Sequence, residues 1–261
     1  MNNLLYAFRY LIYSLRAKDE HSLHSPFLFE LYENVIEPSA EYYKFKEIEA
    51  VRSSMLFSDK TIEITDLGAG SRVSKSNKRK VRHIAQHAVK QDKYGKLLFR
   101  LVNHFKPNTI LELGTSLGIT SSYLAAANSG NQVITFEGCR NISAIAQGNF
   151  KALGLKNIKQ VGGNFDATLP QELAKLDQVD FLYVDGNHRK EPTLNYFKQL
   201  LEKSHNDTIL VFDDIHWSAG MHGAWNEIKA SKEVSVTIDL FYLGIVFLRK
   251  EQTKQDFVLK F

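Results

Sequence analysis

The sequence predicts an α/β fold built on a mostly parallel sheet, closed by a hairpin and preceded by a helical segment. From Pro107 onward, short apolar stretches alternate with amphipathic ones, which is typical of strands alternating with helices. The last two apolar stretches follow each other without a helix between them. The 261 residues, of which 44% are hydrophobic and 24% charged, supply enough apolar area for a sizeable core.

The first sixteen residues predict an amphipathic helix. One face carries Leu4, Leu5, Phe8, Leu11, Ile12 and Leu15, and the other carries Tyr6, Arg9, Tyr10 and Tyr13. Arg9 interrupts the apolar stretch and no small-residue cleavage site follows, which argues against a signal peptide. We expect the helix to pack on its own domain or on a sister subunit, and a membrane-surface helix is the alternative.

The rest of the amino-terminal part reads as helices and loops. Ser25-Pro26 is a typical helix start, with a capping serine and a proline in the first turn. The further elements that we expect are a helix over 41–56, a strand over 61–65 and a helix over 94–105. The prediction is a mainly helical cap over residues 1–92 and a second domain over 93–261. His21 and His24 are interpreted as packing residues, and the Asp66–Gly70 loop is interpreted as a turn in the cap.

The net charge of +4 is unevenly distributed along the chain. Eight lysines and arginines but one acid lie between Arg72 and Lys93, so this segment carries +7 and the rest about −3. We interpret residues 72–93 as a solvated helix and a lid loop. The alternative is a docking patch for nucleic acid phosphates.

Seven strands are predicted in the second part. They are 109–113, 132–137, 157–161, 179–185, 207–213, 234–240 and 243–249, with helices over 119–128, 141–153, 168–175, 190–203 and 219–231. Nearly continuous apolar strands that alternate with helices indicate a parallel sheet covered on both faces. The last two strands form a hairpin that must add an antiparallel strand at the sheet edge.

Polar and glycine residues gather where the predicted strands end, which is where open parallel sheets bind ligands. Gly114 and Gly118 follow the first strand with the spacing G-x-x-x-G, not the G-x-G-x-x-G of nicotinamide enzymes. Glu137 ends the next strand and is placed to hold two ribose hydroxyls. Asn164-Phe165 follows the third strand and suits the edge and face of an adenine. Asp185-Gly-Asn-His188 follows the fourth strand.

These four motifs, in this order and with the closing hairpin, resemble the class I S-adenosylmethionine-dependent methyltransferases over about residues 93–249. The resemblance implies a Rossmann-like seven-stranded sheet and S-adenosylmethionine as cofactor. It places the 114–118 loop along the methionine part, Glu137 on the ribose and Asn164-Phe165 beside the adenine. The cofactor-binding residues that it implies are Glu112, Gly114, Thr115, Ser116, Gly118, Glu137, Gly138, Asn164, Phe165 and Asp185.

Within this class the chain is similar to the catechol and caffeoyl-CoA type of O-methyltransferase. The similarity is carried by Tyr94–Leu98, Ile110–Ile119, and Val184–His188 together with Val211–Asp214. It implies a divalent cation, Mg²⁺ or else Mn²⁺ or Ca²⁺, held by Asp185, Asp213 and Asp214. Asp214 stands where the family has asparagine. The alternative is that Asp185 contacts cofactor or substrate while the other two aspartates cap the next segment.

The same similarity places His188 at the position of the family's general base, which is usually lysine there. Imidazole changes its protonation state near neutral pH and can accept a hydroxyl proton. Asp185 is expected beside it in the catalytic centre. Trp217, after the aspartate pair, is interpreted as a wall of the substrate pocket.

The sequence therefore predicts methyl transfer to a hydroxyl of a small molecule, with metal assistance left open. The alternatives are an RNA methyltransferase that docks through residues 72–93, and a cofactor-binding protein without turnover. Against the first, the Asn/Asp-Pro-Pro-aromatic motif for base methylation is absent from the sequence. The sequence contains no run of about 20 apolar residues, so it predicts no membrane-spanning helix. The lone Cys139 fits a reducing compartment, so a cytoplasmic location is expected, and a homodimer is left open.

Overall fold

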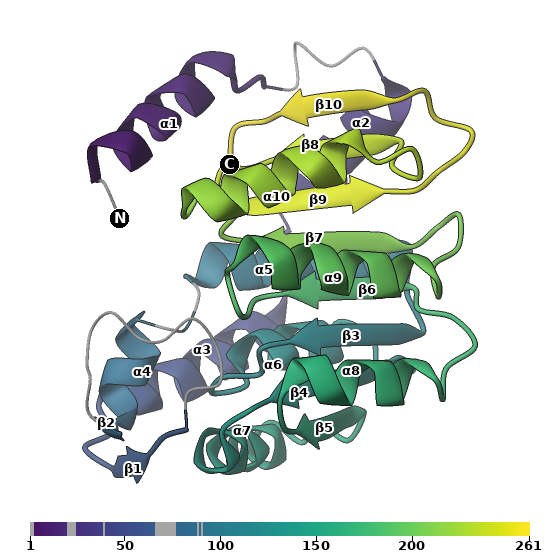
Figure 1. Cartoon of the computed structure of the whole chain (residues 1–261). Coiled ribbons are helices and arrows are strands. Elements are labelled where there is room, and N and C mark those ends of the chain that lie inside the picture. The colour runs from purple at the N-terminus through teal and green to yellow at the C-terminus, as the bar shows by residue number, and fades with distance from the viewer. Residues whose placement is uncertain (1–2, 20–24, 39, 66–76, 88, 90) are drawn as a thin grey trace. The chain divides into compact units, whose positions relative to one another are not determined.

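The computed structural model describes residues 3–19, 25–38, 40–65, 77–87, 89 and 91–261, with side chains described from residue 6 onward (Figure 1). The chain divides into two compact units. The first combines Met1–Glu37 with Glu172–Phe261, and the second spans Pro38–Gln171. The predicted boundary at residue 92 does not coincide with this division, because the first 37 residues pack with the carboxyl-terminal part of the chain.

The first unit contains helices around a mixed sheet. Its helices are α1 (Asn3–Arg16), α2 (Pro26–Leu31), the π-helical turn η2 (Tyr32–Ile36), α9 (Lys190–Leu201) and α10 (Ala219–Ala230). Its strands are β6 (Phe181–Val184), β7 (Ile209–Asp213), β8 (Val236–Asp239), β9 (Leu243–Phe247) and β10 (Gln255–Val258). The strand order is β10-β8-β9-β7-β6.

The predicted hairpin is confirmed, and the structure contains one further strand beside it. β9 runs antiparallel to both β7 and β8, as the absence of a crossover helix predicted. β10 then pairs parallel to β8, so the edge lies one strand further out than expected. Its four residues are half-buried or exposed, and this weak apolar signal explains why the sequence did not reveal the strand.

Both faces of β9 are covered by helices of the same unit. The backbone of Gly244 lies so close to the Trp225 ring of α10 that a Cβ at this glycine would meet the ring at 2.7 Å. Phe247 points to the opposite face, since side chains alternate along a strand. It meets Phe27 of α2 edge to face, with ring centroids 5.1 Å apart. In Figure 1, α10 and α9 lie over one face of this sheet.

The second unit contains three parallel strands and a group of helices. Its strands are β3 (Thr109–Leu113), β4 (Gln132–Glu137) and β5 (Ile158–Gly162), in the order β3-β4-β5, and a separate antiparallel pair β1 (Thr61–Glu63) and β2 (Lys78–Lys80). Its helices are α3 (Tyr43–Leu56), α4 (Val81–His87), α5 (Asp92–Phe105), α6 (Ile119–Ala126), α7 (Arg140–Ala152) and the start of α8 (Phe165–Leu173). The predicted α/β fold, with a mostly parallel sheet and helices around it, is confirmed.

The described part of the basic segment is folded into the second unit. Val81 and Ile84 are buried in a core cluster with residues of α3 and α6. Lys80 and Arg82 both form ion pairs with Asp59, at 2.8 and 2.9 Å. The interpretation as a lid therefore concerns residues 72–76, which lie outside the described residues, as do the Asp66–Gly70 loop, His21 and His24.

None of the helices in the described ranges is long and apolar enough to cross a bilayer.

Candidate active site

The glycine loop between β3 and α6 is held by backbone hydrogen bonds. The N–H groups of Gly114 and Thr115 both donate to the Phe136 carbonyl of β4, at 3.0 Å. Three loop residues have positive φ: Gly114 at 111°, Ser116 at 48° and Gly118 at 80°. The loop thus turns sharply from strand to helix and exposes part of its backbone at the carboxyl end of β3.

The packing of α7 explains why residue 118 is a glycine, which the G-x-x-x-G spacing alone did not show. A Cβ at this position would lie 2.6 Å from the Phe150 ring and 2.9 Å from Cβ of Ala146, both on α7. Glycine here permits the close packing of α6 against α7. The predicted contact of Gly118 with a cofactor stays a prediction.

Glu137 is fixed in orientation at the end of β4. Its Oε2 accepts from the Ser116 N–H at 2.9 Å and its Oε1 accepts from the Cys139 N–H at 2.9 Å. The side chain is half-buried, at the same end of the strands as the glycine loop. This arrangement suits a pair of vicinal hydroxyls.

Glu112 lies deeper and has a different environment. The residue is fully buried, and its Oε2 accepts from the hydroxyls of Ser121 and of Thr135, the latter at 2.6 Å. The Thr115 and Thr135 hydroxyls lie 2.5 Å apart. Glu112 therefore links α6 and β4 through the Ser121 and Thr135 hydroxyls, and Thr135 in turn contacts Thr115 of the glycine loop.

The residues predicted beside an adenine lie at the start of α8. Asn164 is exposed and caps this helix, since its Oδ1 accepts from the Asp166 N–H at 2.9 Å. Phe165 is half-buried and Gly163, with φ 132°, precedes the pair. Gly138, between Glu137 and Cys139, is half-buried too. All the predicted cofactor residues except Asp185 thus belong to the second unit.

Asp185 and His188 come together in the first unit. His188 Nε2 lies 3.5 Å from Asp185 Oδ1, and the Tyr183 hydroxyl donates to Asp185 Oδ2 at 3.2 Å. Asn187 has positive φ, at 64°, and its side chain donates to the Tyr196 hydroxyl at 3.0 Å. This tight turn brings His188 back toward Asp185, as the three-residue spacing predicted.

The predicted cation ligands do not form a cation site. Asp213 is buried at the end of β7, and Asp214 follows it with φ 53°. Among the described residues, no group of three or more histidine, cysteine, aspartate or glutamate side chains could hold a metal ion. The set of Asp185, Asp213 and Asp214 therefore does not fit the implied metal, although Asp185 and Asp213 end neighbouring parallel strands.

A second Asp–His arrangement in the first unit was not predicted. The buried His216 donates from Nε2 to Asp239 Oδ2 at 2.7 Å, and its Nδ1 lies 3.1 Å from Nδ1 of His222. Burial lowers the pKa of His222, and the nearby His216 and Arg9 act in the same direction. His216 follows β7, His222 lies on α10 and Asp239 ends β8, and β9 separates β7 from β8 in the sheet. No local sequence signal therefore marks the three residues as neighbours.

Trp217 is half-buried beside this cluster. Its ring lies edge to face with Tyr6 of α1, with centroids 6.4 Å apart. The side chain contacts the amino-terminal helix, and its interpretation as a pocket wall stays a prediction.

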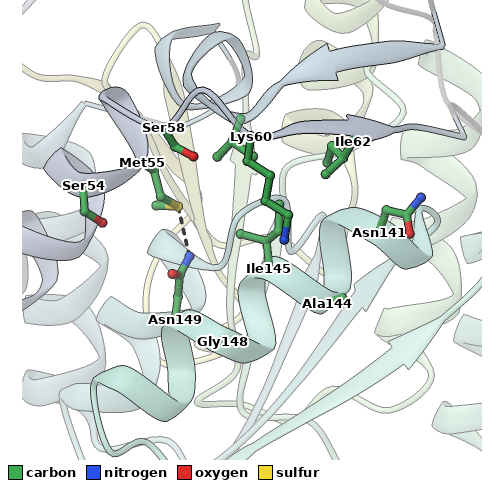
Figure 2. A pocket seen from close by; sticks show the side chains of 11 residues that line it. Ser54, Met55, Ser58, Lys60, Ile62, Asn141, Ala144, Ile145, Gly148 and Asn149 are labelled. Carbon is green, nitrogen blue, oxygen red and sulfur yellow. Dashed lines mark hydrogen bonds between the residues drawn. The ribbon is translucent and has the colours of Figure 1, made fainter.

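A cavity of about 460 Å³ lies in the second unit, away from these residues. Figure 2 shows its lining residues on α3, β1 and α7, with the Lys60 side chain pointing toward Ile145. Asn149 Nδ2 contacts the Met55 sulfur at 3.0 Å on its wall and also donates to the Leu117 carbonyl at 2.8 Å. None of the predicted site residues lines this cavity.

Comparison with known proteins supports the methyltransferase reading of the strand ends. Residues 111–215 match the family model described as a methyltransferase domain, and this range contains every residue predicted to bind the cofactor, to hold a metal or to act in catalysis. No curated protein matches the chain.

Solved structures share the fold at low sequence identity. An O-methyltransferase from Bacillus cereus in complex with SAH is 20% identical, with a TM-score of 0.54 over 85% of this chain and 97% of that one. The O-methyltransferase TomG from Streptomyces achromogenes, in complex with SAM, is 18% identical, with a TM-score of 0.55 over 89% and 99%.

A third structure is a putative caffeoyl-CoA O-methyltransferase from Staphylococcus aureus. It is 14% identical, with a TM-score of 0.56 over 64% of this chain and 90% of that one. Residues 111–215 are therefore similar to a methyltransferase domain, and the chain shares its fold with solved O-methyltransferase structures that hold SAM or SAH.

Proposed function

We propose that this protein transfers a methyl group from S-adenosylmethionine to a hydroxyl oxygen of a small molecule. The observation that carries the cofactor assignment is the Glu137 carboxylate, which two backbone N–H groups orient beside the glycine loop. The relatives crystallised with SAM or SAH support the same assignment. Their description as O-methyltransferases supports oxygen as the acceptor atom.

The residues of this chain divide the work as follows. Glu137 binds the two ribose hydroxyls, the 114–118 loop lies along the amino acid part, and Asn164 and Phe165 lie beside the adenine. Bound S-adenosylmethionine supplies an electrophilic methyl group on a sulfonium sulfur. Glycine and hydroxyl residues in this loop leave room for the cofactor without adding charge.

His188 is the proposed proton acceptor. As the acceptor oxygen forms its bond to the methyl carbon, the carbon–sulfur bond breaks and the hydroxyl proton passes to the imidazole. Asp185 stabilises the imidazolium that forms, since the two side chains already lie 3.5 Å apart. The products are the methyl ether and the uncharged thioether form of the cofactor.

The cofactor assignment is tested by calorimetry on Glu137→Ala. Removing hydrogen bonds to a charged group costs about 1.5–3 kcal/mol, so affinity for S-adenosylmethionine should fall roughly 10- to 150-fold. Glu47→Ala serves as control, because Glu47 forms an exposed ion pair with Lys44 on α3. Unchanged affinity in the Glu137 variant would refute the assignment.

The base assignment is tested by turnover of His188→Gln in a methyl-transfer assay with labelled cofactor and a panel of phenols and catechols. A positioned base contributes roughly 10²- to 10⁴-fold, so kcat should fall by that order while cofactor affinity stays unchanged. His205→Gln is the matched control, because His205 forms an Asp–His pair with Asp180 at 2.8 Å at the opposite end of β6. Equal turnover of the two variants would contradict the role of His188.

The same assay separates metal-assisted from metal-free transfer. Because the three aspartates do not form a cation site, we expect full activity in EDTA. Activity that is lost in EDTA and restored by Mg²⁺ would reinstate the cation that the family resemblance implies.

A further inference from the structure

The amino-terminal helix α1 is docked on the first unit by its tyrosine face. The Tyr13 hydroxyl donates to the Leu259 carbonyl at 2.6 Å, and Arg9 donates to the His216 carbonyl at 3.1 Å. Tyr10 meets the Phe241 ring edge to face, with centroids 4.9 Å apart, and Tyr6 does so at 5.2 Å. These directional contacts fix how the helix is rotated about its axis.

The opposite face of α1 is apolar and exposed. Phe8, Leu11 and Leu15 follow one another at helical spacing, with 58%, 55% and 78% of their surfaces exposed. The helix thus packs on its own unit, as expected, but it does so through the tyrosine face and not through this apolar face. Leaving a row of large apolar side chains in water is unfavourable, so such a row marks an interaction site.

The charged residues on α1 and as far as Lys18 are all basic, and two acids, Asp19 and Glu20, follow them. The fourteen residues of α1 include no aspartate or glutamate, and the exposed Arg16 and Lys18 lie at its carboxyl end. The next acid, Asp19, forms an ion pair with Lys260 at 3.0 Å. An apolar row bordered by cations is complementary to a surface with an apolar interior and anionic headgroups.

The size of the row argues against a second copy of this chain as the partner. A row of three or four side chains offers on the order of a few hundred Å², whereas a stable dimer buries about 800 Å² per partner. A second copy would also bring the same cations to the contact. A helix lying in a bilayer surface needs only shallow insertion of one apolar face.

We propose that α1 binds the surface of a membrane that contains anionic lipids, with Phe8, Leu11 and Leu15 inserted and Arg16 and Lys18 at the headgroups. The tyrosine face stays on the protein, so the helix attaches the folded unit to the lipid without unfolding from it. This inference does not depend on the methyl-transfer reaction.

Co-sedimentation of the full chain with vesicles tests the proposal. Vesicles of phosphatidylcholine with phosphatidylglycerol should bind the protein, and vesicles of phosphatidylcholine alone should bind it at least about tenfold more weakly. The triple variant Phe8→Ser, Leu11→Ser, Leu15→Ser should lose binding at least about tenfold. Phe57→Ser is the matched control, because Phe57 is 85% exposed in the second unit and should not contribute.

The charge variant Arg16→Glu, Lys18→Glu provides a second test that leaves the apolar row intact. It should bind anionic vesicles roughly tenfold or more weakly, and its thermal unfolding midpoint should match the wild type. Absence of vesicle binding, or equal binding by the triple variant and Phe57→Ser, would overturn the proposal. A dimer in sedimentation equilibrium that the triple variant abolishes would show instead that a second copy covers the row.

Discussion

At the scale of single residues, the candidate site is a set of side chains that the backbone holds in place. Ser116 and Cys139 fix the Glu137 carboxylate with their N–H groups, so the loop and the acid form one rigid corner. The sequence predicted this acid from its place at a strand end. It could not predict that the Ser121 and Thr135 hydroxyls donate to Glu112, because these contacts depend on the packing of α6 and β4 around it. The predicted contact of Glu112 with a cofactor stays a prediction.

Gly118 carries a prediction about stability. Gly118→Ala should lower the free energy of unfolding by about 1–3 kcal/mol or more, because φ is 80° and a Cβ would lie 2.6 Å from the Phe150 ring. Urea unfolding measures the change. Gly148→Ala is the matched control on α7: nothing lies within 4 Å of a Cβ there, so it should gain about 0.5–1 kcal/mol. Equal effects of the two variants would contradict this account of Gly118.

At the scale of elements, the periodicity of the sequence predicts well where helices and strands lie. It predicts less well which face of an element packs against the rest of the protein. Hydrophobic spacing predicted α1 correctly as a helix. The choice of face could not be predicted, since tyrosine rings pack as apolar groups and also satisfy buried carbonyls with their hydroxyls. Short strands such as β2 and β10 consist of charged or half-exposed residues and therefore carry no apolar signal. Only their pairing with a neighbouring strand in the structure identifies them.

Phe241 should control the docking of α1. It has φ 66° and contacts the rings of Tyr6, Tyr10, Tyr13 and His216. Phe241→Ala removes the surface on which the tyrosines pack, so trypsin should cleave after Arg9 and Arg16 faster than in the wild type. Mass spectrometry of the fragments over time measures this, with Phe57→Ala as control. Unchanged cleavage rates would mean that the hydrogen bonds of Tyr13 and Arg9 alone hold the helix.

At the scale of the whole molecule, the basic segment bears on whether the methyl acceptor is a small molecule or RNA. In the described part of the basic segment, Lys80 and Arg82 are engaged with Asp59. We therefore expect weak binding to tRNA in filter-binding assays at moderate salt. Tight binding that weakens by about 0.7–0.9 log units per log unit of salt for each phosphate would favour the RNA alternative.

The overall α/β class, the succession of strands along the chain and the residues that follow each strand could be predicted, because each rests on local pattern. The division into units could not, because it depends on contacts between the chain's two ends, such as Tyr13 with Leu259. The contact between His216 Nε2 and Asp239 Oδ2, 2.7 Å apart, could not be predicted for the same reason, because 23 residues separate the two in the sequence.

The first unit joins the first 37 residues to the last part of the chain, and this has a consequence for synthesis on the ribosome. The second unit is continuous and can fold while the chain is still being made. The residues that α1 and α2 pack against are translated after the whole second unit. At roughly 5–20 residues per second, the nascent helices wait on the order of ten to forty seconds before the faces that pack on this part of the chain are covered. Slower translation should therefore increase the need for chaperones that shield the newly made amino terminus.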